Sequence, residues 1–351
     1  MDSSDNSEIL SILKEYEIPF SLSLIQYWAF FAKDKYNIFK IPKRSGGFRE
    51  IYAPHKKLKE ILQAFNKFFQ AKYNSFYTDK CFISPAHGFM LGRSVATNAK
   101  EHEHKKYVLN IDLENFFPSI AQARVWKMLQ CKPFYFNVRT ANLLACLLCY
   151  QTPQNPNDIK NLFLGKKYDN SGNFLPQGAP TSPMISNFIC RKLDFKLGKL
   201  AREFEASYTR YADDITFSFY NNLCQNDEFF KSIKQIIEEE NFKINYKKVR
   251  IQNYKMSQVV TGLVVNEKIN VTRKFIKDLR ALIYMVENYG FDSANSYFAD
   301  LNENKNILNV IKGKLNYLKM IKGANNNTYL KLFDRYLNIK KNFEQQNNYY
   351  S

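Results

Sequence analysis

The stretch SYTRYADDITFSF at residues 207–219 decides the fold that we expect of this chain. Strand-forming runs flank the adjacent carboxylates of Asp213 and Asp214, a pattern that predicts two strands around a tight turn. Adjacent carboxylates repel each other, and apolar surroundings increase that cost, so a positively charged partner is expected. A solvated hairpin turn explains an isolated Asp-Asp pair as well, because Asp is common in turns.

A second acidic position lies in the short apolar run YVLNIDL at residues 107–113, where Asp112 ends a predicted buried strand. If this strand lies beside the 207–219 hairpin, three carboxylates converge at one end of a small sheet. Mg²⁺ takes a few carboxylates together with substrate phosphates, and two such ions can bind the attacking and the leaving oxygen of a phosphoryl transfer. The three aspartates, on a basic chain, therefore indicate nucleotidyl transfer.

The chain of 351 residues carries a formal net charge of +18, and its basic excess is spread along the whole length. This balance favours a polyanionic partner, nucleic acid before an anionic membrane surface, although a solubility charge explains it too. The sequence has no apolar run of about 18 residues that would span a membrane. Cys146 and Cys149 form a C-x-x-C inside an apolar stretch, so we expect buried helix thiols rather than zinc ligands, and a reducing cytoplasm.

The remaining patterns divide the chain into a strand-rich centre between helical ends. Two short β-like runs within residues 41–54 flank Ser45-Gly46-Gly47, which is a hairpin signal with basic arms. Residues 151–173 are rich in Asn, Pro and Gly and predict an exposed loop. Helical patterns cover residues 7–40, 56–72, 121–150, 183–197, 228–241 and 272 onward, with further short strands within 242–252 and 257–271.

Three motifs in this order carry a family resemblance: NIDLENFFPSI at 110–120, LPQGAPTSP at 175–183 and YADD at 211–214. Through them the sequence resembles reverse transcriptases over nearly its whole length. The resemblance implies an α+β right-hand polymerase with fingers, a palm built on a small antiparallel sheet, and a helical thumb. The implied regions are N-terminal helices and fingers at 1–106, a palm at 107–271 with fingers helices and an insertion loop at about 121–174, and a thumb at 272–351.

Two further signatures make the chain most similar to the bacterial retron reverse transcriptases. Asn98-Ala99-Lys100-Glu101-His102 matches the retron N-A-x-x-H, and Val260-Thr261-Gly262 matches the retron V-T-G. The resemblance implies that Asn98, His102, Val260, Thr261 and Gly262 belong to regions that recognise a cognate structured RNA, which proteins read mainly by shape and 2′-OH. His102 is also explained as a helix surface residue, since it lies in a polar run.

The same resemblance assigns the metal-binding and sugar-selecting roles. It implies that Asp112 and Asp213 bind two Mg²⁺ ions, that the Leu113 carbonyl is a further ligand, and that Asp214 completes the site. Phe117 stands five residues after Asp112, where the family keeps a ring that clashes with a ribose 2′-OH and so selects dNTPs. Core packing beside the neighbouring phenylalanine is the alternative explanation for Phe117.

The remaining implied contacts are to the incoming dNTP. Gln177 contacts the nucleotide, while Lys43 and Arg49 on the Gly-Gly hairpin hold the triphosphate, for which a planar guanidinium is well suited. A solvated basic turn explains Lys43 nearly as well. Lys248 lies near the pyrophosphate, with Lys247 as a close competitor for that role.

The implied activity is RNA-directed DNA synthesis on a cognate noncoding RNA, primed from the 2′-OH of an internal guanosine and giving branched msDNA. A role in antiphage defence is implied, with a separate effector protein as partner, because we expect no fused effector domain. We also expect no RNase H, since the sequence shows no second carboxylate cluster, so removal of the template would need a host nuclease. Two alternatives stay open: a group II intron-like reverse transcriptase, and a non-enzymatic RNA-binding scaffold of a defence complex. The intact aspartates favour an enzyme over the scaffold.

Overall fold

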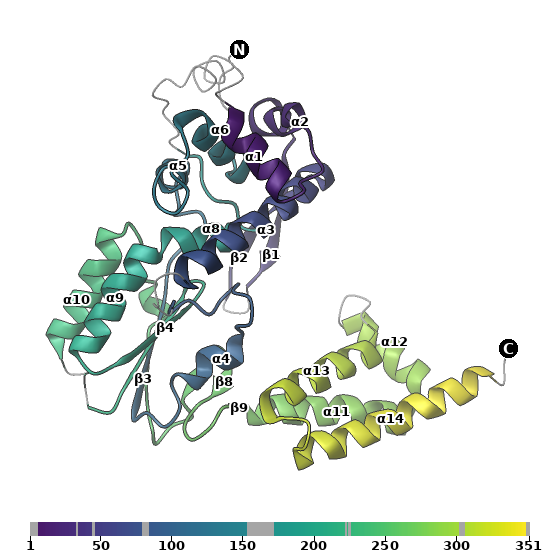
Figure 1. Cartoon of the computed structure of the whole chain (residues 1–351). Coiled ribbons are helices and arrows are strands. Elements are labelled where there is room, and N and C mark those ends of the chain that lie inside the picture. The colour runs from purple at the N-terminus through teal and green to yellow at the C-terminus, as the bar shows by residue number, and fades with distance from the viewer. Residues whose placement is uncertain are drawn as a thin grey trace. The chain divides into compact units, whose positions relative to one another are not determined.

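The computed structural model describes residues 6–32, 34–43, 46–78, 84–152, 172–221, 223, 226–301 and 306–348. Contacts divide the chain into two compact units (Figure 1). Unit 1 comprises Met1–Ser94, Leu109–Phe217 and Asn222–Arg250, and unit 2 comprises Val95–Val108, Ser218–Asn221 and Ile251–Ser351. These two units do not test the predicted division into fingers, palm and thumb, which stays a prediction.

The N-terminal part of unit 1 holds short helices and one long hairpin. Its elements are α1 (Ser7–Glu15), α2 (Leu22–Gln26), the π-helix η2 (Tyr27–Phe31), β1 (Tyr36–Pro42), β2 (Phe48–Pro54) and α3 (Lys56–Thr78). The prediction that helix continues to residue 40 is wrong, because antiparallel pairing with β2 extends from Pro42↔Phe48 to Tyr36↔Pro54 and satisfies these backbone groups as strand. The predicted hairpin around the Gly-Gly turn is confirmed, and it is longer than expected.

The four-stranded sheet contains the strand predicted at 107–113 and the hairpin predicted at 207–219. Its strands are β3 (Tyr107–Asp112), β4 (Ser207–Tyr211), β5 (Asp214–Phe219) and β6 (Arg250–Asn253), in the order β4-β5-β3-β6. Every residue of β5 after Asp214 is buried, which matches its apolar sequence. The predicted strand at 107–113 and the predicted hairpin at 207–219 are both confirmed.

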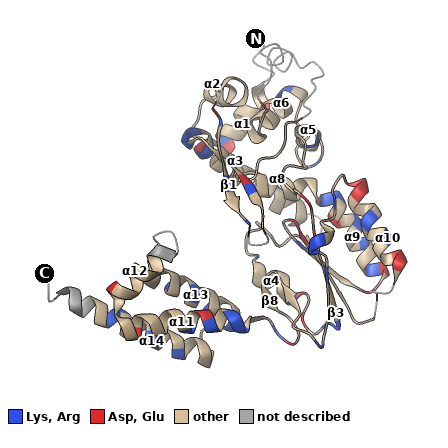
Figure 2. Cartoon of the chain, turned by 180° about the vertical axis from the view of Figure 1, so that it is seen from behind, with Lys and Arg blue, Asp and Glu red and all other residues tan. Residues whose placement is uncertain are grey.

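Helices complete unit 1: α5 (Gln122–Leu129), α6 (Val138–Leu148), α8 (Ser182–Ile189), α9 (Arg191–Glu203), α10 (Asp227–Glu239) and the 3₁₀ turn η4 (Tyr246–Lys248). The single helix expected at 183–197 is two helices that meet at Cys190. On α9, Lys196 pairs with Glu239 at 2.7 Å and with Glu240 at 2.8 Å, and Figure 2 shows basic and acidic residues side by side on α9 and α10. Opposite charges therefore compensate each other on these helices.

Two sequence expectations concern the region around α6. Cys146 and Cys149 are free and fully buried, so the expectation of buried thiols is confirmed. Most of the predicted 151–173 loop lies outside the described residues. At its described flanks the Thr152 amide donates to Asn173 Oδ1 at 3.0 Å, which joins the two ends of the insertion.

Unit 2 contains α4 (Val95–Lys100), the small antiparallel sheet β7-β8-β9 (Val259–Val260, Leu263–Val264, Asn270–Val271) and the helices α11 (Arg273–Tyr289), α12 (Phe291–Leu301), α13 (Ile307–Lys322) and α14 (Asn327–Asn348). Thr272 caps α11 by accepting from the Phe275 amide at 3.2 Å. Leu279 and Ile283 pack with Ile311 in one buried apolar cluster. The helical C-terminal part is confirmed, and none of the described helices is long and apolar enough to cross a membrane.

Candidate active site

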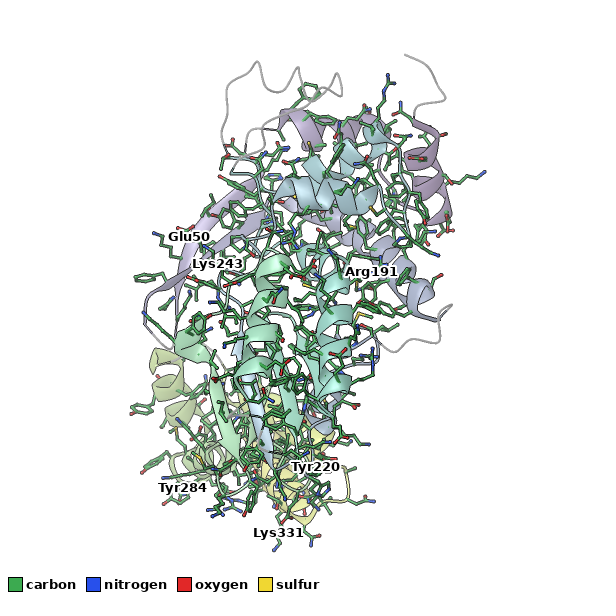
Figure 3. The ribbon with its side chains drawn as sticks, turned by 90° about the vertical axis from the view of Figure 1, so that its left-hand side faces the viewer. Glu50, Arg191, Tyr220, Lys243, Tyr284 and Lys331 are labelled. Atoms are coloured by element: carbon green, nitrogen blue, oxygen red, sulfur yellow. The ribbon has the colours of Figure 1, made fainter. Side chains whose placement is uncertain are left out.

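A pocket of about 1560 Å³ lies within unit 1 and brings the three predicted catalytic residues together. Asp112 reaches it from the end of β3, whereas Asp213 and Asp214 reach it from the turn between β4 and β5. The β1–β2 hairpin and the segment around Asn245 form other parts of its wall. Glu50 of β2 and Lys243 both line the pocket and are labelled in Figure 3. The expectation that these aspartates converge is therefore met.

The turn that carries Asp213 is fixed by its neighbours. Ala212 has a φ of +56°, a left-handed conformation that is uncommon for a residue other than Gly. The Leu113 amide donates to the Asp213 carbonyl at 3.1 Å, which joins the end of β3 to the turn. A Cβ on Gly88 would lie 2.8 Å from the Ala212 nitrogen, so only a glycine fits at that position against the turn.

Asp112 is 8% exposed and is held by two side chains. Lys248 Nζ lies 2.7 Å from Asp112 Oδ1, and Asn245 Nδ2 donates to Asp112 Oδ2 at 3.1 Å. The Asn245 amide also donates to the Asp112 carbonyl at 2.8 Å, since residues 243–245 run antiparallel to residues 112–114. Asn245 therefore orients both the backbone and the carboxylate of Asp112.

The remaining two carboxylates are costly to ionise in this protein. Burial, and then repulsion from Asp112, raise the pKa of Asp213, against the opposing effect of Lys248 and Arg49. Asp214 is exposed to the open pocket, yet desolvation by the pocket wall and repulsion from Asp213 raise its pKa to about 6. A bound cation would stabilise the ionised forms of Asp213 and Asp214, because it offsets both the desolvation and the repulsion.

Whether these residues fit a divalent metal follows from the donor set. Among the described residues, no three Asp, Glu, His or Cys side chains already form a metal centre. Three carboxylates at one pocket, two of them with raised pKa, are nevertheless the hard oxygen ligands that Mg²⁺ prefers. The donors therefore fit a divalent cation, and Lys248 supplies the counter-charge to Asp112 in the present arrangement.

All five residues predicted to contact the dNTP line the pocket: Lys43, Arg49, Phe117, Gln177 and Lys248. The competitor Lys247 lines it too, but Lys248 is the lysine that pairs with Asp112. The Tyr52 amide donates to the Gln177 carbonyl at 2.8 Å, which attaches the loop before α8 to the β1–β2 hairpin.

Phe117 differs from its neighbour in the way that the sugar-selecting role requires. Phe116 is 3% exposed and stacks on Phe242 with ring centroids 5.6 Å apart. Phe117 is only half-buried and presents its ring to the pocket. Core packing therefore describes Phe116, and the assignment of Phe117 to sugar selection stays a prediction.

The residues assigned to RNA recognition lie in unit 2. Asn98, His102 and Val260 have fully buried side chains, and His102 Nδ1 lies 2.7 Å from Ser218 Oγ. Thr261 and Gly262 form the turn between β7 and β8, with φ values of +46° and +84°. Burial leaves the side chains of Asn98, His102 and Val260 no surface for direct contact with RNA in this conformation, and their assignment to RNA recognition stays a prediction.

Three residues of the site region were not found from the sequence. Asn245 binds Asp112 across a chain separation of more than a hundred residues, and nothing in its local pattern marks it. Gly88, in a loop distant in the sequence, packs against the turn at Ala212 and Asp213, which we call the catalytic turn. Arg210 is a charged residue inside a strand, which was the available signal, and it is fully buried.

The fold and the pocket together indicate the class of protein. The strand ends of a palm-type sheet present three aspartates to a pocket lined by several basic residues, and this arrangement is expected of a right-hand polymerase. The family model described as "Reverse transcriptase (RNA-dependent DNA polymerase)" matches residues 41–270.

Several curated proteins are similar to this chain. The retron Mx65 reverse transcriptase of Myxococcus xanthus is 34% identical over 250 residues, which cover 71% of this chain and 55% of that protein. The retron Mx162 reverse transcriptase of Myxococcus xanthus is 32% identical over 284 residues, or 75% of this chain and 56% of that protein. The retron Ec86 reverse transcriptase of Escherichia coli is 32% identical over 272 residues, or 76% of this chain and 73% of that protein. The chain thus spans just over half the length of the two Myxococcus relatives. It belongs to the reverse transcriptase family and, within it, to the retron reverse transcriptases.

Proposed function

We propose that the chain is an RNA-directed DNA polymerase that copies part of a cognate structured noncoding RNA into DNA. The observation that carries the proposal is the meeting of Asp112, Asp213 and Asp214 in one pocket with basic and aromatic residues from three other segments. A binding scaffold has no need of neighbouring carboxylates whose pKa values are raised, as those of Asp213 and Asp214 are, since ionising them is costly unless a cation offsets their repulsion.

The carboxylates of Asp112, Asp213 and Asp214, with the carbonyl of Leu113, would hold two Mg²⁺ ions. Bound there, such ions lower the pKa of a primer hydroxyl and neutralise the charge that develops on the pyrophosphate. Asn245 keeps the Asp112 carboxylate oriented, through its 3.1 Å hydrogen bond.

The dNTP would be bound by side chains from both walls of the pocket. Arg49 and Lys43 on the β1–β2 hairpin pair with the triphosphate, and Lys248 is released from Asp112 to the phosphates as the substrate enters. Gln177 contacts the nucleotide, and the ring of Phe117 excludes a ribose 2′-OH. Together these contacts orient the substrate before the chemical step, which is a major part of catalysis by positioning.

The retron-specific part of the proposal concerns priming and product. The protein would start DNA synthesis from the 2′-OH of an internal guanosine of its noncoding RNA and give branched msDNA. It would act in antiphage defence with a separate effector protein. The N-A-x-x-H and V-T-G signatures and the retron relatives support this part. In the turn between β7 and β8, Thr261 is half-buried and Gly262 is exposed, so this turn is the surface of the V-T-G signature that RNA would reach.

The test is DNA synthesis by the purified protein with the noncoding RNA encoded beside its gene, dNTPs and Mg²⁺. Asp213→Asn is expected to abolish synthesis, whereas the matched Asp227→Asn, on the exposed first turn of α10, is expected to leave it unchanged. Absence of DNA with the unmodified protein, or wild-type synthesis by Asp213→Asn, would refute the polymerase proposal.

The product of the same experiment distinguishes the retron hypothesis from the alternative of a group II intron-like reverse transcriptase. Treatment of the product with a debranching enzyme is expected to release a linear DNA, because the proposed linkage is a 2′,5′-phosphodiester. Equal synthesis on an unrelated RNA hairpin at moderate salt would contradict recognition of a cognate RNA, since non-specific phosphate contacts weaken as salt rises.

A further inference from the structure

A buried ion pair lies directly behind the catalytic turn. Arg210, the fourth residue of β4, has a fully buried side chain, and the Asp194 side chain on α9 is 1% exposed. Arg210 Nε donates to Asp194 Oδ1 at 2.7 Å, and Nη2 donates to Asp194 Oδ2 at 2.7 Å. Tyr208 adds a third hydrogen bond to this carboxylate, also at 2.7 Å. The pair therefore has the two-pronged geometry that only a guanidinium can provide.

The remaining nitrogen of Arg210 points at the turn itself. Nη1 donates to the Ala212 carbonyl at 3.1 Å and to Asn187 Oδ1 at 3.1 Å. Asn187 Nδ2 in turn donates to the Gly88 carbonyl at 3.0 Å. One rigid side chain thus connects α9, α8 and the residue immediately before Asp213, and the same network holds Gly88 against that residue.

Stability alone is a poor explanation for this pair. Removing two charges from water is costly, and well-packed apolar replacements of a buried ion pair are often neutral or stabilising. Burial acts to lower the pKa of Arg210, but the Asp194 carboxylate outweighs it and holds that pKa well above the usual range, so the guanidinium stays charged. Ala212 keeps an uncommon left-handed conformation, which persists only where its surroundings impose it.

We propose that Arg210, held by Asp194, is a positioning residue that fixes the carbonyl of Ala212 and thereby the placement of Asp213 in the pocket. The proposal rests on the proposed polymerase function. Arg210 is fully buried and does not line the pocket, so its side chain is not placed to contact a substrate or a metal. Its effect reaches the reaction only through the backbone of the residue next to Asp213.

The test replaces the pair in a way that preserves packing. The double variant Asp194→Leu/Arg210→Met removes both charges together, so no unpaired charge is left buried. The matched control Lys199→Met/Glu203→Leu removes an exposed i,i+4 ion pair on α9, 3.6 Å apart, that does not reach the pocket. For the Asp194/Arg210 variant we expect kcat to fall by about tenfold to hundredfold. KM for dNTP should change little, because Lys43, Arg49 and Gln177 are untouched, and the control should retain wild-type kcat.

A second variant and a second measurement keep the proposal falsifiable. Arg210→Lys keeps a charge for Asp194 but has a single nitrogen, which cannot reach both the carboxylate and Ala212. Titration of the purified proteins with Mn²⁺, followed by electron paramagnetic resonance, reports on the placement of Asp213 without any DNA synthesis. We expect both variants to bind Mn²⁺ at least severalfold more weakly than the wild type.

Wild-type kcat and Mn²⁺ affinity in either folded variant would overturn the proposal. If thermal melting shows that neither variant is folded at the assay temperature, the pair is a stability element and the proposal is rejected. A wild-type protein that binds Mn²⁺ but makes no DNA contradicts the proposed function alone, so the two failures are distinguishable.

Discussion

Replacement of Gly88 by alanine tests how tightly the catalytic turn is held. The new Cβ would lie 2.8 Å from the backbone nitrogen of Ala212, about 0.6 Å inside the 3.4 Å at which ordinary van der Waals contact begins. The obstacle is backbone, so a side-chain rotation cannot relieve it. Gly88 has little room to retreat, because its carbonyl accepts a hydrogen bond from Asn187 at 3.0 Å. We therefore expect the turn that carries Asp213 to move.

The size of the effect follows from that displacement. Misplacement of reacting groups by about 1 Å costs about a hundredfold in rate. A shift of a few tenths of an ångström should then lower kcat by roughly tenfold, which corresponds to about 1.4 kcal/mol of transition-state free energy. The residues predicted to contact the dNTP lie on other segments of the pocket, so KM should change less than kcat.

The assay is single-nucleotide extension by Gly88→Ala on the cognate RNA, with kcat and KM determined separately. Gly198→Ala is the matched control, because its Cβ on α9 would meet its nearest neighbours at an ordinary 3.8 Å. In a helix this change should raise the free energy of unfolding by roughly 0.5–1 kcal/mol and leave kcat unchanged. A folded Gly88→Ala protein with wild-type kcat would refute the reasoning, since the loop rather than the turn must then have given way.

Three further predictions concern Phe117, Asn245 and Lys35. Phe117→Ala should raise incorporation of rNTPs relative to dNTPs by roughly tenfold or more in competition assays, and unchanged selectivity would return Phe117 to a packing role. Asn245→Ala removes a hydrogen bond to the Asp112 carboxylate, so kcat should fall by about tenfold or more and half-saturation should need more Mg²⁺; if neither changes, Asp112 does not depend on Asn245. Burial lowers the pKa of Lys35 from 10.5 to about 8, so the folded protein releases this proton at a lower pH than the unfolded chain. The free energy of unfolding of the wild type therefore rises by up to about 3 kcal/mol as pH rises from 8 towards 10.5. In denaturant melts at pH 7, Lys35→Met should have a higher free energy of unfolding than the wild type. This difference should be smaller at pH 9. An advantage that grows with pH would contradict this sign.

The candidate site was predictable where its signals are local. The strand ending at Asp112 and the turn at Asp213 each follow from a few consecutive residues, since apolar runs and turn residues report on their own backbone. The dNTP residues came from motifs, and Lys43, Arg49, Phe117, Gln177 and Lys248 do line one pocket.

The errors have a physical pattern. The prediction of helix to residue 40 is wrong at Tyr36–Lys40, where Tyr, Ile and Phe favour strand, and cross-strand hydrogen bonds to β2, which no local window shows, decide the conformation. In the same way, His102 stands in a polar run, which made a surface position the alternative explanation for it, yet packing within unit 2 buries its side chain completely.

The sequence alone predicted the chemistry that we propose for this protein, from three aspartates, a basic chain, and motifs in the order of a reverse transcriptase. Those features depend only on residue identity and spacing, so they can be recognised without knowing the tertiary contacts. Only the tertiary structure decided how the catalytic turn is supported, with Asn245 on Asp112, Gly88 against Ala212, and the Arg210–Asp194 pair beneath it. Each of these supports joins segments that are distant in the chain, so its energy exists only after the long-range contacts have formed.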